Sequence, residues 1–389
     1  MDGDHNSSCH PPLPPITADD RIARLRLLRS RRVGIATYHR LIFEHGSAAA
    51  ALDALPEIAR AKGMIQYQTC PEGVVHKELN SGRLHNARLV FTGEPAYPTA
   101  LAQIADAPPC FWMIGDIAIA RRPCVALVGA RNASSNGTRI AAKLAQGLGE
   151  AGITVVSGLA RGIDAAAHQA SLDTGTIAAQ AGGVDVIYPT ENAALAQAIP
   201  HPGMRISEQP IGLSPQARHF PRRNRLISGL SSAVVVIEAA AKSGPLITAR
   251  QALDQGRDVM AVPGHPIDSR ASGCNMLIRD GATLVRGIDD ILAALAPQTD
   301  MPLFAQPKPS QPRALAEPKA DFTHKPLRET AKLHQAILSR IGPAPTSEDQ
   351  LIRDLNTGAQ NVNAALIELE LDGQLERTPG GLVTKIPRN

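Results

Sequence analysis

The stretch that decides the fold is Val125-Ala126-Leu127-Val128-Gly129-Ala130-Arg131, an apolar run that ends in a glycine turn. A helical pattern follows it, and strand, glycine turn and helix in this order are typical of a parallel βαβ unit. The pattern repeats along the chain. The predicted strands are Cys124–Val128, Ile153–Val156, Thr176–Ala179, Ala233–Ile237 and Asp258–Val262, and the predicted covering helices are Asn136–Glu150, Ile163–Leu172, Ala193–Ala198, Arg222–Leu230 and Leu246–Gln255. An α/β fold with a parallel sheet is therefore expected.

Composition changes divide the 389-residue chain into five segments. The polar, proline-rich residues 1–18 predict a disordered leader, and residues 19–70 predict a small helical domain. The α/β pattern is assigned to residues 71–296. Residues 297–326 hold seven prolines and few apolar side chains, which is typical of an extended linker. Residues 327–389 show three helical stretches and a glycine-tipped hairpin, and they resemble a winged helix.

Helices within the first domain are predicted over Thr37–Glu44 and Ala48–Leu55, with Ser47 as the N-cap of the second. Between helices, Val33-Gly34-Ile35 resembles the turn of helix-hairpin-helix DNA binders, whose backbone N–H groups face phosphate. A small helical packing domain is the alternative interpretation, and the residues alone leave both open. In the tail, the predicted helices are Leu327–Arg340, Ser347–Leu355 and Ala359–Asp372.

Bulk composition excludes several classes of protein. No apolar run reaches the roughly 20 residues that a membrane span requires, so a cytoplasmic protein without membrane contact is expected. The five cysteines are scattered without a CxxC pair, which argues against a zinc site or a disulfide framework and predicts no metal. The net charge is only +4, so nucleic-acid binding would need local clusters of basic residues.

The turn after the first predicted strand carries Gly129 and Arg131 and runs into a helix N-terminus, where free N–H groups favour an anion. The dinucleotide fingerprint requires a second glycine two residues after the first, and Arg131 stands there. Its guanidinium would fill the pyrophosphate space and can itself bind phosphate. The turn therefore predicts phosphate binding and argues against NAD, so no cofactor is expected.

The turn after the second strand is Ser157-Gly158-Leu159-Ala160-Arg161-Gly162, where glycines allow a close backbone approach to a ligand or to a neighbouring turn. Asp164 and His168 follow, four residues apart and on one helical face. A metal site would need further ligands nearby, and the sequence offers none. Helix capping with a local hydrogen bond is the predicted role of this pair.

The strongest basic cluster is Arg218-His219-Phe220-Pro221-Arg222-Arg223-Asn224-Arg225, with four arginines in eight residues. Helical spacing predicts that Arg222 and Arg225 share a face and that Arg223 turns away from it. Phe220 is expected just before the helix, where its ring can stack on a base. Basic groups beside an exposed ring are typical of sequence-independent single-strand binding.

A third glycine turn spans Lys242-Ser243-Gly244-Pro245-Leu246-Ile247-Thr248. The turns after the strands of an open parallel sheet lie along one edge, so this turn, Arg131, Ser157-Gly158 and the arginine cluster are predicted to line one basic groove. The sequence has no catalytic triad, no HExxH and no GxxxxGK[ST] P-loop, so no enzyme is expected.

These motifs together resemble the DNA-processing protein A (Smf) family. The resemblance rests on Val128–Arg131, Ser157–Asp164, His168, Ala181–Pro189, Ser207-Glu208, Phe220–Ile227, Ser243–Arg250 and Val262-Pro263-Gly264. It implies an extended Rossmann-like domain with a SAM-like N-terminal domain and a winged-helix tail. It also implies single-stranded DNA binding, homodimers, protection of incoming DNA, and loading of a RecA-type recombinase during natural transformation.

The expected DNA-binding residues are Gly129, Arg131, Ser157, Gly158, Arg218, Phe220, Arg222, Arg223, Asn224, Arg225, Lys242, Ser243, Gly244 and Thr248. The resemblance places the dimer interface at Met276, Leu277 and Ile278, with 281–285 following. Two departures from the family pattern stand out. Gln216-Ala217 replaces a lysine that many members carry before the Phe, and Pro245 replaces a serine.

Two other functions remain open at this point. The first is a Rossmann-type nucleotide hydrolase of the lysine-decarboxylase-like group, although its PGGxGTxxE motif does not occur in the sequence. The second is a regulator that binds duplex DNA through the tail domain.

Overall fold

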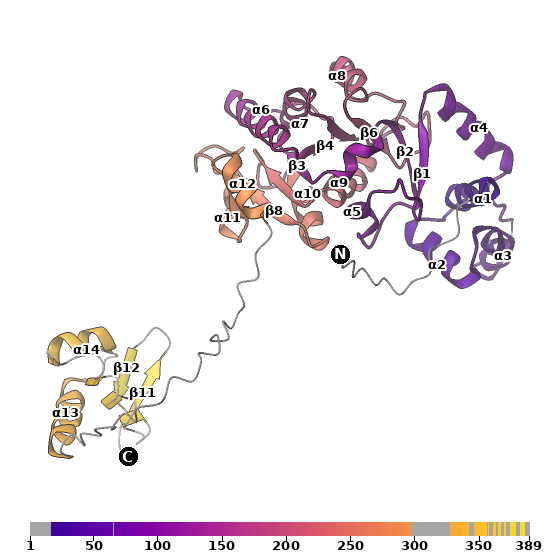
Figure 1. Ribbon diagram of the computed structural model, residues 1–389. Helices are drawn as coiled ribbons and strands as arrows, with labels where there is room; N and C mark the ends of the chain where they lie inside the picture. The colour runs from indigo at the N-terminus through magenta and orange to yellow at the C-terminus, as the bar shows by residue number, and fades with distance from the viewer. Residues whose placement is uncertain are drawn as a thin grey trace, which may run out of the picture. The chain divides into compact units, whose positions relative to one another are not determined.

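The computed structural model describes residues 17–64 and 66–296 together with much of 327–385 (Figure 1). The chain divides into two compact units, Met1–Thr299 and Asp300–Asn389. The predicted linker and residues 1–16 of the predicted leader lie outside the described residues.

The first unit is built on a nine-stranded sheet with the order β1-β2-β6-β5-β4-β3-β7-β8-β9. The strands are β1 Arg88–Phe91, β2 Cys110–Gly115, β3 Cys124–Val128, β4 Thr154–Ser157, β5 Thr176–Ala179, β6 Met204–Ser207, β7 Ala233–Val236, β8 Asp258–Ala261 and β9 Thr283–Leu284. Strands β6 to β9 in this order are parallel, whereas β1 and β2 add an antiparallel edge. The strand order reverses at β3, so the sheet is doubly wound.

Helices cover both faces of the sheet (Figure 1). The helices of this part are α5 Thr99–Ala102, α6 Ser135–Glu150, α7 Ile163–Ala170, α8 Ala193–Ala198, α9 His219–Leu230, α10 Gly244–Asp254, α11 Ser272–Arg279 and α12 Ile288–Leu295, with short 3₁₀ turns at Ile117–Arg121 and Thr190–Asn192. One apolar core lies between the sheet and α5, α9 and α10, and a second lies between the sheet and α6, α7 and α12. The central strand β3 is buried along its whole length, which explains its continuous apolar run.

The predicted α/β fold is confirmed, and the five predicted strands agree with β3, β4, β5, β7 and β8 to within one residue at each end. Several helix boundaries were wrong: the helix predicted over Ala48–Leu55 continues to Ala61, and α10 begins at Gly244, two residues earlier than expected. Helix α9 begins at His219, three residues earlier than expected, so Phe220 lies in its first turn and not before it. Pro221 is compatible with this position because the first N–H groups of a helix have no intrahelical partner.

Four helices precede the sheet: α1 Ala18–Arg29, α2 Ile35–His45, α3 Ala48–Ala61 and α4 Glu72–Leu84. The predicted N-cap is confirmed, because the Ser47 side chain accepts a hydrogen bond from Ala50 N at 3.2 Å. Helices α1 and α4 pack against β1 and β2 through a core that contains Leu25, Val75 and Trp112. The Trp112 indole donates to Glu78 at 2.9 Å, and Arg29 forms an ion pair with the same carboxylate.

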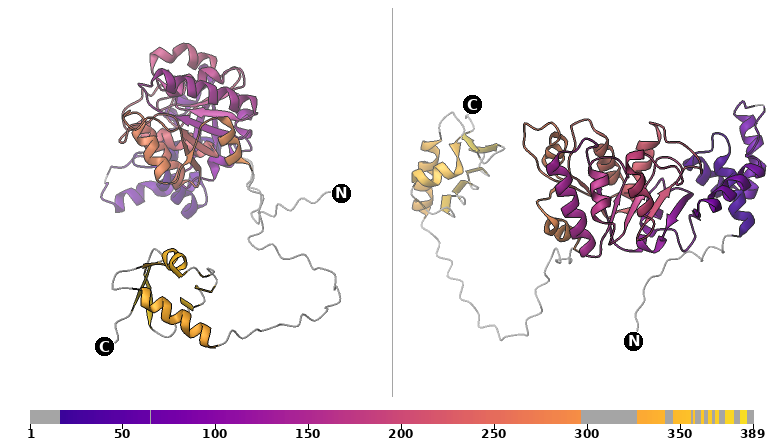
Figure 2. Two further views of the ribbon diagram at one scale, coloured as in Figure 1. Left: turned by 90° about the vertical axis from the view of Figure 1, so that its left-hand side faces the viewer. Right: turned by 90° about the horizontal axis from the view of Figure 1, so that it is seen from above.

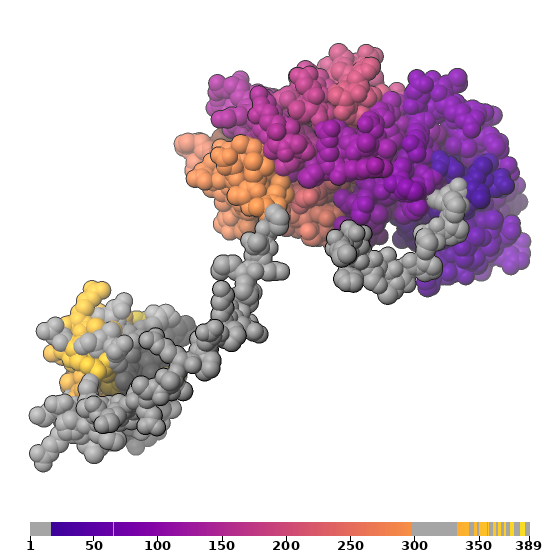
Figure 3. Space-filling model, in the orientation of Figure 1, coloured from indigo at the N-terminus to yellow at the C-terminus, as the bar shows by residue number. Residues whose placement is uncertain are grey.

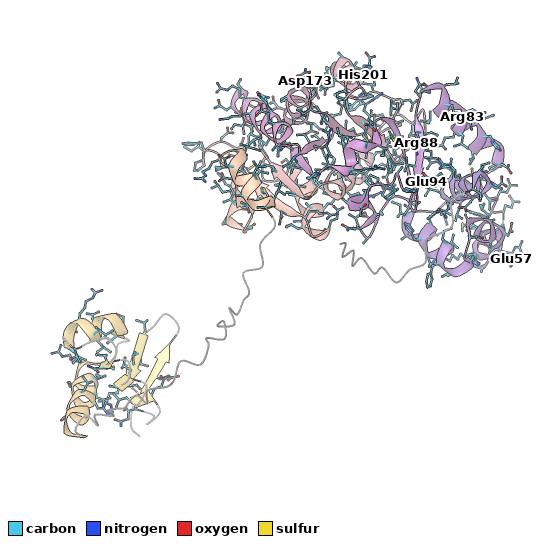
Figure 4. The ribbon with its side chains drawn as sticks, viewed as in Figure 1. Glu57, Arg83, Arg88, Glu94, Asp173 and His201 are labelled. Atoms are coloured by element: carbon cyan, nitrogen blue, oxygen red, sulfur yellow. The ribbon has the colours of Figure 1, made fainter. Side chains whose placement is uncertain are left out.

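Through these contacts the N-terminal helices cover one end of the sheet. Helices α11 and α12 lie at the opposite end (Figures 1 and 2). The surface continues without a break from these helices to the strands (Figure 3). Figure 4 labels Arg88 on β1 and Glu94 just after it. Glu94 forms an ion pair with Arg21 of α1, so charged side chains also fasten this end of the sheet.

The second unit has a small core of its own, formed by residues that include Ile337, Leu351 and Val383. Its elements are α13 Leu327–Arg340, α14 Glu348–Leu355 and strands β10 Thr346–Ser347, β11 Leu375–Thr378 and β12 Leu382–Lys385, in the sheet order β10-β12-β11. Of the predicted helix Ala359–Asp372, the described residues 361–362, 365–366 and 369–370 are helical and the others lie outside the description. No helix in the described ranges is long and apolar enough to span a membrane.

Candidate nucleic-acid interface

A cavity of about 1010 Å³ lies at the carboxyl ends of the parallel strands, where the strand order reverses. We call it the switch-point cavity. Ligands of open α/β sheets bind at this place because the loops on either side diverge there. Its lining includes Gly129, Arg131, Asn132, Ala160, Asp164, Tyr188, Phe220, Arg223, Asn224, Ser243, Gly244, Pro245, Ile247, Thr248, Ser269 and Arg270.

The turn after β3 is held by close packing with the turn after β4. A Cβ at Gly129 would lie 2.5 Å from Ile163, and one at Gly162 would lie 2.3 Å from the Ala130 oxygen. Gly162 also has a φ of +75°, which favours glycine. The tight contact leaves Arg131 exposed at the cavity, with its guanidinium carbon 5.0 Å from the centre of the Phe220 ring.

The N-terminus of α6 does not face a free site, contrary to the expectation from the glycine turn. The Glu238 carboxylate, which follows β7, accepts hydrogen bonds from the Ser134 amide at 2.9 Å and from the Ser134 hydroxyl. The Ser134 hydroxyl oxygen in turn accepts from Gly137 N at 2.9 Å. An intramolecular carboxylate therefore occupies the anion position, and it also ties the loops after β3 and β7 together.

The N-terminus of α10 opens into the cavity instead. No side chain caps this helix, because the Ser243 hydroxyl donates to the Ala240 oxygen at 2.8 Å. A Cβ on Gly244 would meet nothing within 4 Å, so a ligand can approach the backbone here. Pro245 fits the first turn but supplies no N–H, which removes one donor relative to a serine. Thr248 is buried one turn further along.

Arg223 is a buried arginine in the wall of the cavity. Its guanidinium donates to the carbonyl oxygens of Gly158 and Ala179, at the ends of β4 and β5. Burial lowers the pKa of Arg223 to about 10, and the nearby Asp164 carboxylate opposes that shift. Arg223 therefore remains a cation at neutral pH, with much of its hydrogen-bonding capacity already used.

Ser157 and Gly158, both expected to contact DNA, lie beneath Arg223. A Cβ at Gly158 would be 2.5 Å from an Arg223 nitrogen, so glycine is required for the arginine to pack there. The Ser157 hydroxyl donates to the Leu127 oxygen at 2.7 Å and is fully buried. Neither residue lines the cavity, and the structure assigns both to its support.

The prediction for Asp164 and His168 is right about local hydrogen bonds and wrong about helix capping, because no side chain caps the N-terminus of α7. Asp164 accepts hydrogen bonds from Gly158 N at 3.1 Å and Ala160 N at 3.4 Å, and burial raises its pKa. His168 accepts from Leu159 N at 3.3 Å, and burial lowers its pKa to about 3. The pair therefore shapes the turn after β4, in which Leu159 has a positive φ of 56°.

Phe220 lies at the centre of an aromatic and cationic cluster. Its ring centre is 5.8 Å from that of Tyr188, with the planes inclined by 58°. Arg131 and Arg223 both approach the same ring, at 5.0 and 5.9 Å. Tyr188 is half exposed, so the cluster offers an aromatic face to a ligand.

The arginine cluster divides across α9. Arg223 and Asn224 line the switch-point cavity, whereas Arg222 and Arg225 line a separate one, as the helical spacing predicted. Arg225, an expected phosphate contact, is buried in ion pairs with Glu208 and Asp106. Its guanidinium also donates to the Asp106 oxygen at 2.6 Å. Arg225 therefore fastens α9 to the loops before β2 and after β6.

Arg218 and Lys242 are exposed, but neither lines the switch-point cavity. Sequence reasoning missed Tyr188, Ile247 and Arg270, which do. Tyr188 stands in one of the quoted family motifs, whereas nothing local marked Arg270. Within the described ranges, no group of three or more His, Cys, Asp or Glu side chains could hold a metal ion, and Cys70, Cys110, Cys124 and Cys274 are buried and free.

The fold and this cavity together define a class: a Rossmann-type binding protein whose site suits a ligand with both a phosphate and a flat base. Comparison with known proteins narrows the class. Residues 88–296 match the family model for DNA recombination-mediator protein A, residues 18–81 match a DprA-like N-terminal HHH domain, and residues 318–381 match a DprA winged helix domain. The chain belongs to the DNA recombination-mediator protein A family.

Individual relatives agree with this assignment. The chain is 35% identical over 325 residues to Protein Smf from Synechocystis, covering 76% of this chain and 79% of the relative. The X-ray structure of DNA processing protein A from Streptococcus pneumoniae has a TM-score of 0.56 at 33% identity and covers 72% of this chain and 93% of that one. A Helicobacter pylori DNA processing protein A structure, described by its single-stranded DNA binding mode, has a TM-score of 0.50 at 29% identity and covers 54% and 95%.

The family resemblance noted in the sequence is thus confirmed, as is the three-part fold. The match to an HHH model also decides between the two interpretations of Val33-Gly34-Ile35, in favour of the helix-hairpin-helix class.

Proposed function

We propose that this protein binds single-stranded DNA in the switch-point cavity, protects incoming strands, and loads a RecA-type recombinase onto them during natural transformation. The observation that carries the proposal is the exposed guanidinium of Arg131 over the ring of Phe220. A cation and a ring side by side are the two elements that sequence-independent single-strand binding combines.

In this proposal, a base stacks in the cluster formed by Phe220 and Tyr188. Its phosphate is held by Arg131 and by the open N-terminus of α10, where Gly244 allows close approach. Lys242, exposed beside the same turn, adds positive charge at the rim. Stacking on a ring face reads no base edge, so the site is expected to accept any sequence.

The relatives support this choice of ligand, since the Helicobacter protein is described by its single-stranded DNA binding and the Streptococcus relative is named a DNA processing protein. The state of the carboxylate in the cavity lining and of the buried histidine on the same helix argues for binding without catalysis. His168 and Asp164 are both buried and committed to backbone amides, and a histidine with a pKa of about 3 is a poor general base at neutral pH. A cytoplasmic location follows from the role, because strand and recombinase meet there.

We further propose that the protein acts as a homodimer through α11 and β9. Met276, Leu277 and Ile278 are half-buried, and Leu284 on the edge strand β9 is 40% exposed. An apolar side chain on the open edge of a sheet is a feature that a second copy can cover. Two linked cavities on one strand would raise the effective concentration of the second contact.

The experiment is a titration of the full chain with a labelled oligonucleotide at several salt concentrations. Arg131→Ala is expected to weaken binding about ten-fold, the size of one charge-assisted contact, and to flatten the slope of log affinity against log salt by roughly 0.7. Arg121→Ala is the matched control, because Arg121 is exposed but precedes β3 and so lies at the opposite edge of the sheet. Equal binding by wild type and Arg131→Ala would refute the proposed site. Release of free base from nucleoside monophosphates would support the hydrolase instead.

A further inference from the structure

A second cavity, of about 490 Å³, lies between the N-terminal helices and the Rossmann-like domain. We call it the hairpin cavity, because Val33, Gly34 and Ile35 form one of its walls. Its lining also includes residues of α1, α9 and α10, of the start of β2 with the segment before it, and of the segment after β6: Leu28, Arg29, Pro221, Arg222, Arg225, Gln251, Asp106, Pro108, Pro109, Cys110, Glu208 and Gln209. Pro221 also lines the switch-point cavity, so the two cavities adjoin across this residue.

Among the described residues that line the hairpin cavity, Arg222 is the arginine without a salt bridge, whereas Arg29 and Arg225 are both in ion pairs. Arg222 is also exposed. The neighbouring Arg225, in contrast, is 6% exposed and committed to Glu208 and Asp106. Burial raises the pKa of Glu208, and Arg225 and Arg222 both oppose that shift, so Arg222 lies close enough to act on the cavity electrostatically.

The remaining walls suit a flat, partly apolar group. Pro108, Pro109 and Pro221 present rigid apolar surfaces, and Leu28 and Val33 add further apolar lining. One polar atom in the wall is left unpaired: the Gln251 amide donates to the Pro221 oxygen at 3.1 Å, but its side-chain oxygen is buried and has no hydrogen-bond partner. A buried acceptor without a partner is costly, and a ligand N–H would satisfy it.

We propose that a single strand held in the switch-point cavity continues across Pro221 into the hairpin cavity, which takes a second nucleotide of the same strand. The base lies between the prolines with an N–H toward Gln251, and its phosphate meets Arg222. This inference rests on the proposed single-strand function. The proposed path explains why the arginines of α9 are divided between two cavities. Arg223 then faces one nucleotide, and Arg222 faces the next part of the same strand.

Gly34 offers a direct way to test the proposal. A Cβ there meets nothing within 4 Å, and its backbone, with φ −92° and ψ 178°, is extended and allowed for any residue. Gly34 is the N-cap of α2, where Asp and Asn are both preferred residues. Gly34→Asp therefore adds a negative charge at the cavity wall without a steric clash, and Gly34→Asn is a neutral control of the same shape.

The experiment compares the full chain with Gly34→Asp, Gly34→Asn and Arg222→Ala by fluorescence anisotropy. Two labelled ligands are used: a single nucleotide, which fills only one cavity, and a strand of about twelve nucleotides, which can reach both. Gly34→Asp and Arg222→Ala are expected to lose about ten-fold in affinity for the long strand. They should keep wild-type affinity for the single nucleotide, and Gly34→Asn should match wild type on both. The salt slope of Arg222→Ala on the long strand should flatten by roughly 0.7.

Two results would overturn the inference: wild-type affinity of both charge variants for the long strand while Arg131→Ala loses it, or equal losses on both ligands. The failure of the proposed function looks different. In that case Arg131→Ala and Arg222→Ala would both bind the two ligands as the wild type does.

Discussion

Replacing Arg225 with alanine is expected to destabilise the fold and to leave the salt dependence of DNA binding unchanged. The side chain is 6% exposed, and its partners Glu208 and Asp106 are 12% and 55% exposed. Removing one member of a buried ion pair costs about 3–5 kcal/mol, because the other charge stays buried without compensation. Asp106 is largely solvated, so losing its ion pair with Arg225 adds little to this cost in stability. Glu208 borders a cavity that water can enter, so a loss near the lower end, about 3 kcal/mol, is expected.

The single tryptophan provides the assay. Trp112 lies in β2 and is 2% exposed, so its fluorescence reports on the first unit alone during urea unfolding. With a slope near 3 kcal/mol per molar urea, the midpoint should fall by about 1 M. Arg131→Ala is the matched control, because this exposed side chain should change binding without moving the midpoint.

The loss in free energy of unfolding that Arg225→Ala causes should also depend on pH. Burial raises the pKa of Glu208, and Arg225 opposes that rise, so the pKa climbs further in the variant. A carboxyl group with a raised folded-state pKa costs stability as pH rises through that pKa and costs none below its unfolded value. The variant should therefore lie closer to wild type at about pH 5 than at about pH 8. Glu208→Gln in the same chain should recover part of the loss. An unchanged midpoint with a flatter salt slope would show that Arg225 contacts phosphate after all.

Three further outcomes follow from the structure. Lys242→Ala should weaken single-strand binding less than Arg131→Ala in a direct titration, because Lys242 is exposed beside the cavity and does not line it. Deleting residues 300–389 should leave single-strand affinity within about two-fold, since both cavities lie in the first unit; a folded but inactive truncation would move the site to the tail. Leu284→Arg should give a folded monomer by light scattering and circular dichroism, whereas Leu277→Arg and Ile278→Arg should also lower stability, because both side chains pack in part on the core. A Leu284→Arg chain that stays dimeric would place the interface elsewhere.

Local sequence patterns were sufficient to predict five of the nine strands of the sheet, and they missed β1, β2, β6 and β9. Continuous apolar runs followed by glycine turns specify buried parallel strands, and each of these signals lies within a few residues of its element. The antiparallel strand β2 was harder to predict. Its run from Cys110 to Gly115 leads into a short 3₁₀ turn and not into a covering α-helix, and its place is set by pairing with β6 almost a hundred residues later.

The site could be predicted only in outline. Sequence spacing correctly divided the arginines between two faces of α9, because that depends on helical geometry alone. It did not show which face opens to a ligand. Arg225 meets the Asp106 oxygen 119 residues away, and Glu238 meets Ser134 104 residues away. Contacts at that separation decide whether a charge is free or committed, and no local pattern encodes them.

Three of the charged side chains around the site serve its shape. Glu238 joins the loops after β3 and β7, Arg223 joins α9 to the ends of β4 and β5, and Arg225 fastens the other face of α9. These ties fix the cavity before any ligand arrives, which lowers the entropic cost of binding.

These ties also leave few cations for phosphate. Arg131 and Arg270, which pairs with Asp268, line the switch-point cavity. Lys242 lies beside it, and Arg222 lines the hairpin cavity. Each cavity alone should therefore hold a strand weakly, and tight binding requires several cavities on one strand, within a chain and across a dimer.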